Sequence, residues 1–296
     1  EWNSSVLQAG IRFDNRNINT ESYGVLGDEG SFEAVAKNYN SFNGSLGYKT
    51  DLTKEFTLRI NVASGFRAPN LAELTSNGVH EGANRYEIGN SNLSTEQNIQ
   101  TDINLEYQNS HFEFFANGFY NKINNYIYLN PSAITIAGYD VFNYFQTNAK
   151  LYGGEFGVHF HPHPLDWLHF ESSFETVTGE KQNGEFLPFI PANNWNNSLR
   201  AEFNIKNWLK DGFATLNVSN TFDQRKVSGF ETSTDGYTLV NLGIGGQVTV
   251  WKTHFNININ GNNLFNKNYI AHLSRLKNDG IPNMGRNIVL GINFNL

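Results

Sequence analysis

Apolar and polar side chains alternate along most of this chain. In the last eleven residues, Arg286–Leu296, every second position from Ile288 onward is apolar, and the positions between are mostly Asn, Gly or Val. The same period recurs in Asn98–Tyr107 and Phe255–Asn260. A period of two is typical of a β-strand with one apolar and one polar face. Because the polar face is dominated by Asn, Ser, Thr and Gly rather than by charge, we expect the apolar face to meet lipid and the polar face to line a watery lumen.

Alternation and turn residues together predict about twelve strands in an antiparallel, up-and-down order, which gives an all-β transmembrane β-barrel. The connections alternate between short turns and long loops, which are typical of the periplasmic and extracellular rims of bacterial barrels respectively. An even strand count then places both termini on the periplasmic rim. The predicted strands are Ser4–Phe13, Tyr39–Thr50, Glu55–Phe66, Glu96–Tyr107, Phe112–Leu129, Asp140–His161, Trp167–Val177, Trp195–Ile205, Phe213–Asp223, Tyr237–Val250, His254–Phe265 and Arg286–Leu296.

The large aromatic residues gather at the two predicted rims. Tryptophan and tyrosine prefer the level where lipid headgroups meet hydrocarbon, so they form girdles on membrane barrels. A soluble all-β protein also alternates and also has short turns. It gives no reason for tryptophans to gather at one rim, so the aromatic positions favour the membrane barrel. Trp2, Trp167, Trp208 and Trp251 are predicted to lie at the short-turn rim, and Trp195, Tyr126, Tyr128 and Tyr269 at the opposite one.

Composition is compatible with this interpretation and excludes others. The 296 residues are 39% hydrophobic, and their mean hydropathy of −0.46 arises because only every second strand residue must be apolar. The net charge of −7, with no basic runs between aromatic residues, argues against a nucleic-acid partner. Zero cysteines fit a periplasm-exposed protein without disulfides. The chain opens at Glu1 with no signal peptide, which we interpret as the start of a processed or truncated product.

Two motifs flank the predicted loop after the third strand. The resemblance that they carry is to the barrel of TonB-dependent outer-membrane receptors, whose "FRAP…EL" and "YE-x-GN-x-x-L-x-x-E" segments enclose one extracellular loop. A third similar segment precedes the last strand. The matching residues are Gly65-Phe66-Arg67-Ala68-Pro69-Asn70-Leu71-Ala72-Glu73-Leu74, then Arg85-Tyr86-Glu87-Ile88-Gly89-Asn90-Ser91-Asn92-Leu93-Ser94-Thr95-Glu96, and finally Asn263-Leu264-Phe265-Asn266-Lys267-Asn268-Tyr269 leading to Gly285-Arg286-Asn287.

The resemblance implies a barrel of about twenty-two strands filled by a plug domain. Residues 1–296 would then be the C-terminal portion of that barrel, without the plug and the N-terminal strands. Twelve strands alone would leave two unpaired edges, which lipid cannot solvate. We therefore expect the missing portion to be supplied, or Ser4–Phe13 to close abnormally onto Arg286–Leu296.

The first motif also has a physical interpretation. Pro69 lacks an amide hydrogen and favours an extended Ala68, which suits the place where a strand leaves a sheet. Glu73 and Glu96 can accept hydrogen bonds from loop amides, and Arg67 can pair with either carboxylate. We expect these residues to shape the loop rather than to contact a ligand.

The cargo implied by the resemblance is an iron–siderophore complex or a metal ion. His80 lies beside Glu81 in one predicted extracellular loop, and His272 lies in another. The sequence fragments around these residues are similar to those of the metal-uptake branch of the family. Imidazole with carboxylate is a sound ligand set for Zn²⁺. The bland alternative is that these are solvated loop residues. His159, His161 and His163 have the spacing of metal ligands, but they lie in and beside a periplasmic turn, where initial capture is not expected.

These observations predict a Gram-negative outer-membrane active-transport receptor that is not an enzyme and needs no cofactor. Its expected partners are the cargo, outer-membrane lipid and, through the missing plug, TonB. Two alternatives stay open. One is a self-sufficient twelve-stranded pore, and the other is a barrel hydrolase using Ser173 and His169, although these lie about 13 Å apart along a strand.

Overall fold

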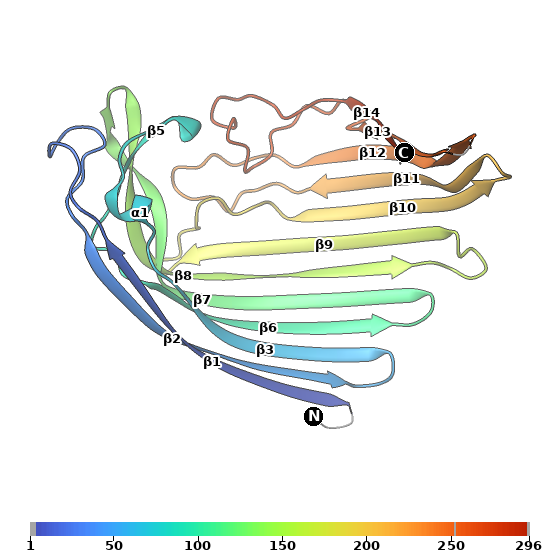
Figure 1. Cartoon of the computed structure of the whole chain (residues 1–296), viewed down its shortest axis with the longest axis horizontal. Coiled ribbons are helices and arrows are strands. Elements are labelled where there is room, and N and C mark those ends of the chain that lie inside the picture. The colour runs from blue at the N-terminus through green and yellow to red at the C-terminus, as the bar shows by residue number, and fades with distance from the viewer. Residues whose placement is uncertain (1–3, 252, 295–296) are drawn as a thin grey trace.

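The computed structural model describes residues 4–251 and 253–294 and consists of one curved sheet (Figure 1). Twelve strands follow one another across the sheet in the order β1-β2-β3-β6-β7-β8-β9-β10-β11-β12-β13-β14. Their bounds are β1 Ser5–Asn19, β2 Ala36–Asp51, β3 Phe56–Arg67, β6 Glu96–Gln108, β7 Phe112–Ile136, β8 Tyr139–Phe160, β9 Leu168–Lys181, β10 Asn194–Ile205, β11 Leu209–Thr221, β12 Tyr237–Val250, β13 Thr253–Asn262 and β14 Asn287–Phe294.

Each of the twelve predicted strands is present, and every consecutive pair along this path is antiparallel. The register keeps apolar residues opposite apolar residues. In the last pair, for example, Ile257 lies opposite Ile292 and Ile259 opposite Leu290. A slip of one residue would move every such pair to the other face, so the alternation in the sequence specifies the pairing.

The predicted strands Phe112–Leu129 and Asp140–His161 leave residues 130–139 as a loop, and this prediction is wrong. The strands on either side continue through the segment. β7 runs to Ile136, and β8 begins at Tyr139. The two-residue connection has Ala137 at φ 51° and Gly138 at φ 85°. Positive φ at both central residues is what a tight hairpin turn needs. Pro131, a poor residue for the middle of a strand, sits at a register shift of this hairpin.

The loop after β3 contains structure that the alternation did not predict. It holds a short helix, α1 (Leu71–Thr75), a small hairpin of β4 (Asn77–His80) and β5 (Arg85–Ile88), and a 3₁₀ turn between them, Glu81–Ala83. β5 also pairs in parallel with the start of β8. The extended β7–β8 hairpin therefore supports this loop from the side (Figure 1).

No second layer covers the apolar face of the sheet in the described part of the chain. Ile11 is 89% exposed and Phe42 77% exposed, and Ile99 and Ile103 of β6 and the alternating apolar residues of β14 are exposed as well. On the opposite face, polar side chains bond to one another across strands, as Arg59 does with Asn104 and Glu106. This is the distribution expected of a sheet with lipid on one side and water on the other. None of the described helices is both long and apolar enough to cross a membrane.

The main buried clusters lie toward one end of the strands, where the long loops are. One cluster joins the loop after β3 to the neighbouring strand ends, and a second joins the 182–193 loop to β8. The packing that fixes tertiary structure is thus concentrated at this end. The first cluster comprises Ile18, Val35, Tyr39, Leu74, Leu93 and Ile127, and the second Ala149, Leu187 and Ile190.

The two rims differ as predicted. The short-turn rim carries the connections 52–55, 109–111, 161–167 and 206–208 and the β12–β13 turn, and β1 begins and β14 ends there. The long-loop rim carries 20–35, 68–95, 182–193, 222–236 and 263–286. Trp167, Trp208 and Trp251 lie in or beside short turns, and Trp251 is 97% exposed. Trp2 lies outside the described residues.

The sheet is open. β1 pairs only with β2 and β14 only with β13 among the described strands, so the abnormal closure of the first strand onto the last does not form. Each edge strand therefore presents a row of backbone amides and carbonyls without a strand partner.

A charge placed on the apolar face should be far more harmful than the same charge on the polar face. Ile103 and Gln100 lie on opposite faces of β6, and Gln100 donates to Asp102 at 2.7 Å. Ile103→Lys should lower the free energy of unfolding by about 2–4 kcal/mol, because the ammonium would meet hydrocarbon. Gln100→Lys, beside Asp102, should change it by less than about 1 kcal/mol. Urea titration of the intact protein in lipid vesicles would measure both, and equal losses would contradict the lipid-facing assignment.

Candidate functional site

The loop that leaves β3 at the long-loop rim is organised by a helix cap. Pro69 is fully buried, and the Asn70 side chain accepts a hydrogen bond from the Glu73 amide at 2.8 Å. The Glu73 carboxylate in turn accepts from the Asn70 amide at 2.8 Å. This reciprocal capping box satisfies two amides that the first turn of α1 would otherwise leave unpaired.

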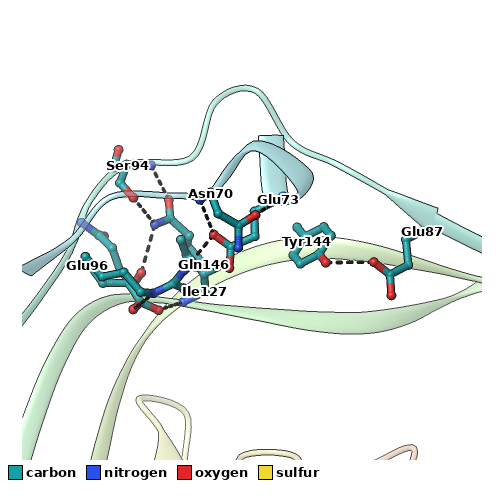
Figure 2. Close-up of polar contacts among 10 residues, drawn as sticks. Asn70, Glu73, Glu87, Ser94, Glu96, Ile127, Tyr144 and Gln146 are labelled. Atoms are coloured by element: carbon teal, nitrogen blue, oxygen red, sulfur yellow. Dashed lines mark hydrogen bonds and ion pairs between the residues drawn. The ribbon is translucent and has the colours of Figure 1, made fainter. Parts of the chain in front are cut away.

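Arg67 bridges the two motifs through a pair of carboxylates. Its Nη1 donates to both oxygens of Glu73 at 2.8 Å, and its Nε donates to Glu96 at 2.6 Å. The side chains of Glu73 and Glu96 are only 10% and 12% exposed, so without the guanidinium each would be a poorly hydrated charge. The other Glu96 oxygen accepts from the Ile127 amide of β7 (Figure 2). The expectation that Arg67 pairs with either carboxylate is met by both at once.

The second motif is anchored on β8. Tyr144 donates to the Glu87 carboxylate at 2.9 Å, as Figure 2 shows, and Arg85 donates to the other Glu87 oxygen at 2.8 Å. The Arg85 guanidinium also lies 5.0 Å from the centre of the Phe142 ring. A charge held in this way, between a carboxylate and an aromatic face, ties β5 to the extended hairpin.

Backbone contacts complete the framework. Gln146 accepts from the Ser94 amide at 2.8 Å and donates to the Ser94 carbonyl at 2.7 Å (Figure 2). The Asn90 amide donates to the Glu73 carbonyl at 2.8 Å. The polar groups of the motif residues therefore form hydrogen bonds within the loop and to the strands beside it. This geometry agrees with the expectation that they shape the loop.

His80 and Glu81 lie at the tip of the β4–β5 hairpin. His80 is the last residue of β4, and Glu81 begins the 3₁₀ turn. Both are exposed, and the described contacts include no hydrogen bond or ion pair to either side chain. A donor pair in this position is accessible to a solute approaching the long-loop rim.

His272 occupies a different environment, inside the 263–286 loop. Its side chain is 3% exposed, and its Nδ1 lies 3.1 Å from the Thr234 hydroxyl and 3.3 Å from the Lys277 ammonium. Its Nε2 faces the Glu231 carboxylate at 3.7 Å. Burial, reinforced by Lys277, lowers the pKa of His272 below its ordinary 6.5, with Glu231 acting in the opposite direction. The pKa of Lys277 is also lowered by burial.

The structure does not bring the three predicted metal ligands together. Within residues 4–251 and 253–294, no contact joins His80 or Glu81 to His272, and their ligand atoms do not form a close group. Alternation could not have revealed these neighbours of His272, because all of them lie in irregular segments. Glu231 and Thr234 belong to the 222–236 loop, and Lys277 belongs to the same 263–286 loop as His272. The one available signal was that all of these loops share the long-loop rim.

Several charged side chains are neighbours on the polar face of β8, β9 and β10. Glu155 lies opposite Glu175, and Arg200 opposite His169, whose Nδ1 is 3.2 Å from the Nε2 of His159. Ser173 has no hydrogen bond to a histidine in the described part of the chain. The arrangement of His169 and Ser173 thus lacks the nucleophile–base contact that a hydrolase requires.

An unbroken antiparallel meander with one apolar and one polar face, long loops at one rim and an open edge at each side defines part of an up-and-down β-barrel. The chain belongs to the family described as "TonB dependent receptor-like, beta-barrel", whose model matches residues 1–264. Barrels of this family belong to the outer membrane of Gram-negative bacteria.

Three solved structures similar to this chain are each more than twice its length. The copper transporter OprC superposes with a TM-score of 0.80 at 17% identity, covering 97% of this chain and 44% of that protein. The FrpB iron transporter from Neisseria meningitidis gives 0.71 at 16%, covering 99% and 43%. BauA, the ferric preacinetobactin receptor from Acinetobacter baumannii, gives 0.68 at 14%, covering 98% and 40%. The chain thus spans less than half the length of these proteins. At identities of 14–17%, the superpositions show a shared fold and nothing further.

Removing Arg67 should open the loop after β3. Arg67→Ala leaves two mostly buried carboxylates unpaired, so the free energy of local opening should fall by about 2 kcal/mol. Hydrogen exchange at the Gly89 and Asn90 amides, which bond to Ser76 and Glu73, should then accelerate about thirtyfold. Arg225→Ala is the matched control, because Arg225 also bridges two carboxylates but in an exposed loop. Equal acceleration of local exchange in both variants would reject the proposed role of burial.

Acid should loosen the 263–286 loop. Since the pKa of His272 is lowered in the folded state, opening the loop takes up a proton. Closure is therefore fully stable above about pH 6.5 and weakens as the pH falls below that value. Exchange of the Ala271 and Ser274 amides, corrected for intrinsic rates, would report this. The pH dependence of the corrected exchange rates should vanish in His272→Gln. If it persists in that variant, another group causes it.

Proposed function

We propose that this chain is the C-terminal portion of the barrel of a TonB-dependent receptor in the Gram-negative outer membrane, which imports an iron–siderophore complex or a metal ion. One observation carries the proposal. A sheet with two open edges superposes along 97–99% of its own length on 40–44% of each of three import proteins. The remaining strands and a lumen-filling plug would come from chain outside residues 1–296.

The sheet itself gives each face a task. The exposed apolar residues of β1, β6 and β14 would contact lipid, and the hydrogen-bonded polar face would meet the plug and the water around it. Partner strands at both edges would satisfy the open backbone groups of β1 and β14. Energy would reach the receptor through TonB acting on the plug. This assignment requires neither a cofactor nor catalysis.

The long-loop rim would make the first contact with cargo. The pairing of β5 with β8 and the Tyr144–Glu87 hydrogen bond hold the β4–β5 hairpin on β8, so His80 and Glu81 are presented on a braced support rather than on a free loop. His80 and Glu81 would supply an imidazole and a carboxylate to a metal ion. His272, enclosed by Glu231 and Lys277, would join them only after its loop opens.

Uptake by intact cells tests the function and the ligands separately. A strain expressing the full-length receptor should accumulate Zn²⁺ or an iron chelate only when TonB is present. In calorimetry of the purified receptor, His80→Ala, Glu81→Gln and His272→Ala should weaken Zn²⁺ binding by roughly tenfold or more. His254→Ala, at the start of β13 on the opposite rim, is the control. Unchanged affinity would reject the three ligands, whereas uptake without TonB would reject the transport mechanism.

A further inference from the structure

Five of the eight histidines gather at one place on the short-turn rim. The place lies where the 109–111 turn meets the 161–167 turn, and neighbouring rings stand 5.4–5.6 Å apart from centre to centre. A cluster this dense does not follow from strand alternation or from the loop motifs. The five are His111, His159, His161, His163 and His169.

Four of them lie on the polar face of the sheet. His111, His159, His161 and His169 alternate with Phe112, Phe160 and Phe170, which belong to the apolar face and pair with one another across β7, β8 and β9. The backbone makes the same connection, since the His161 amide donates to the His111 carbonyl at 3.0 Å. The imidazoles therefore face the lumen side and not lipid.

Three side chains of the cluster already form an open ligand set. Ligand atoms of His111, His161 and Asp166 all lie within 4.8 Å of one another, and the His111 Nδ1 is 4.0 Å from Asp166 Oδ1. That nitrogen is shielded from water and has no hydrogen-bond partner among the described residues. A ring nitrogen that is shielded from water and lacks a hydrogen-bond partner is energetically unfavourable. A hydrogen bond or a bound metal ion would remove this penalty.

The surroundings supply a fourth ligand and outer support. His163 is exposed on the turn, its Nδ1 is 3.3 Å from Asp166 Oδ2, and its ring is 5.6 Å from that of His111. Behind the set, the His159 Nδ1 faces Glu113 at 3.7 Å. Nitrogen and oxygen ligands in a tetrahedral zinc site lie about 2.0–2.2 Å from the ion, so the donors must approach one another by about 1.5 Å. Side chains on a short turn can move that far by rotating.

We propose that His111, His161 and Asp166, with His163 as fourth ligand, form a binding site for a divalent transition-metal ion such as Zn²⁺ or Cu²⁺. Imidazole with one carboxylate selects ions of this class over Mg²⁺ and Ca²⁺, which prefer sets of oxygen ligands. The site is separate from His80, Glu81 and His272, which belong to the other rim. Its location on the periplasmic side, where an imported ion would leave the lumen, rests on the proposed function.

Metal binding by the purified intact receptor tests the site. To remove the other candidate ligands, the measurements are made in a His80→Ala, His272→Ala background. Calorimetry with Zn²⁺ alone should show one ion bound per chain, and His111→Ala, His161→Ala or Asp166→Asn should each weaken it by roughly tenfold or more. His254→Ala, at the start of β13 on the same rim, should leave the affinity unchanged.

Cobalt spectroscopy distinguishes a built site from loose association with surface imidazoles. Co²⁺ bound by these ligands should give the intense visible absorption of tetrahedral coordination, and this band should be lost in Asp166→Asn while thermal unfolding stays that of the parent. Absence of a bound ion in the parent, or equal loss in His254→Ala, would overturn the site. Metal binding at this site and TonB-dependent uptake can fail separately. A protein that does not transport could still bind the ion, and a receptor that transports could lack this site.

Discussion

The backbone hydrogen bonds of the meander are the constraint on which the rest of this structure depends. In hydrocarbon an unpaired amide or carbonyl costs several kcal/mol, so a sheet crosses a bilayer only if every strand has a partner on both sides. Ten of the twelve meander strands meet this condition within the described chain, and β1 and β14 do not. The same requirement that makes the internal register so regular therefore demands further strands at both edges.

Because the backbone groups are paired within the sheet, the side chains of one face can contact lipid and those of the other face water. Because neighbouring residues point to opposite faces, the sheet needs no buried core along most of its length, and Ile11 and Phe42 are exposed without any soluble layer to cover them. Packed clusters occur instead where the long loops fold back on the strand ends. There the chain behaves as an ordinary globular protein and uses Leu74, Leu93 and a partly buried ion network to fix one conformation.

Prediction from the sequence is accurate where local chemistry determines structure. Period two specified the strands, and Pro69 with Arg67 marked the point where β3 ends and its loop begins. It failed at the 130–139 segment, where Asn130 and Pro131 indicate a loop but Ala137 and Gly138 supply a tight turn that lets the hairpin extend. The environment of His272 was beyond prediction for a different reason. Its contacts with Glu231 and Thr234 join two loops that are separated by β12 and β13, and no local pattern encodes such contacts.

The two rims show how far spacing alone can identify a metal site. His80 and Glu81 are adjacent in sequence, but within the part of the chain that the structure describes they form no close group with a third donor. His111 and Asp166 lie on different turns and share a close group with His161. The antiparallel order creates this second grouping, because it brings the β6–β7 and β8–β9 turns side by side at one end of β7 and β8. A transition metal needs several donors within a few ångströms of one point, so contact across strands is a stronger indicator than adjacency along the chain.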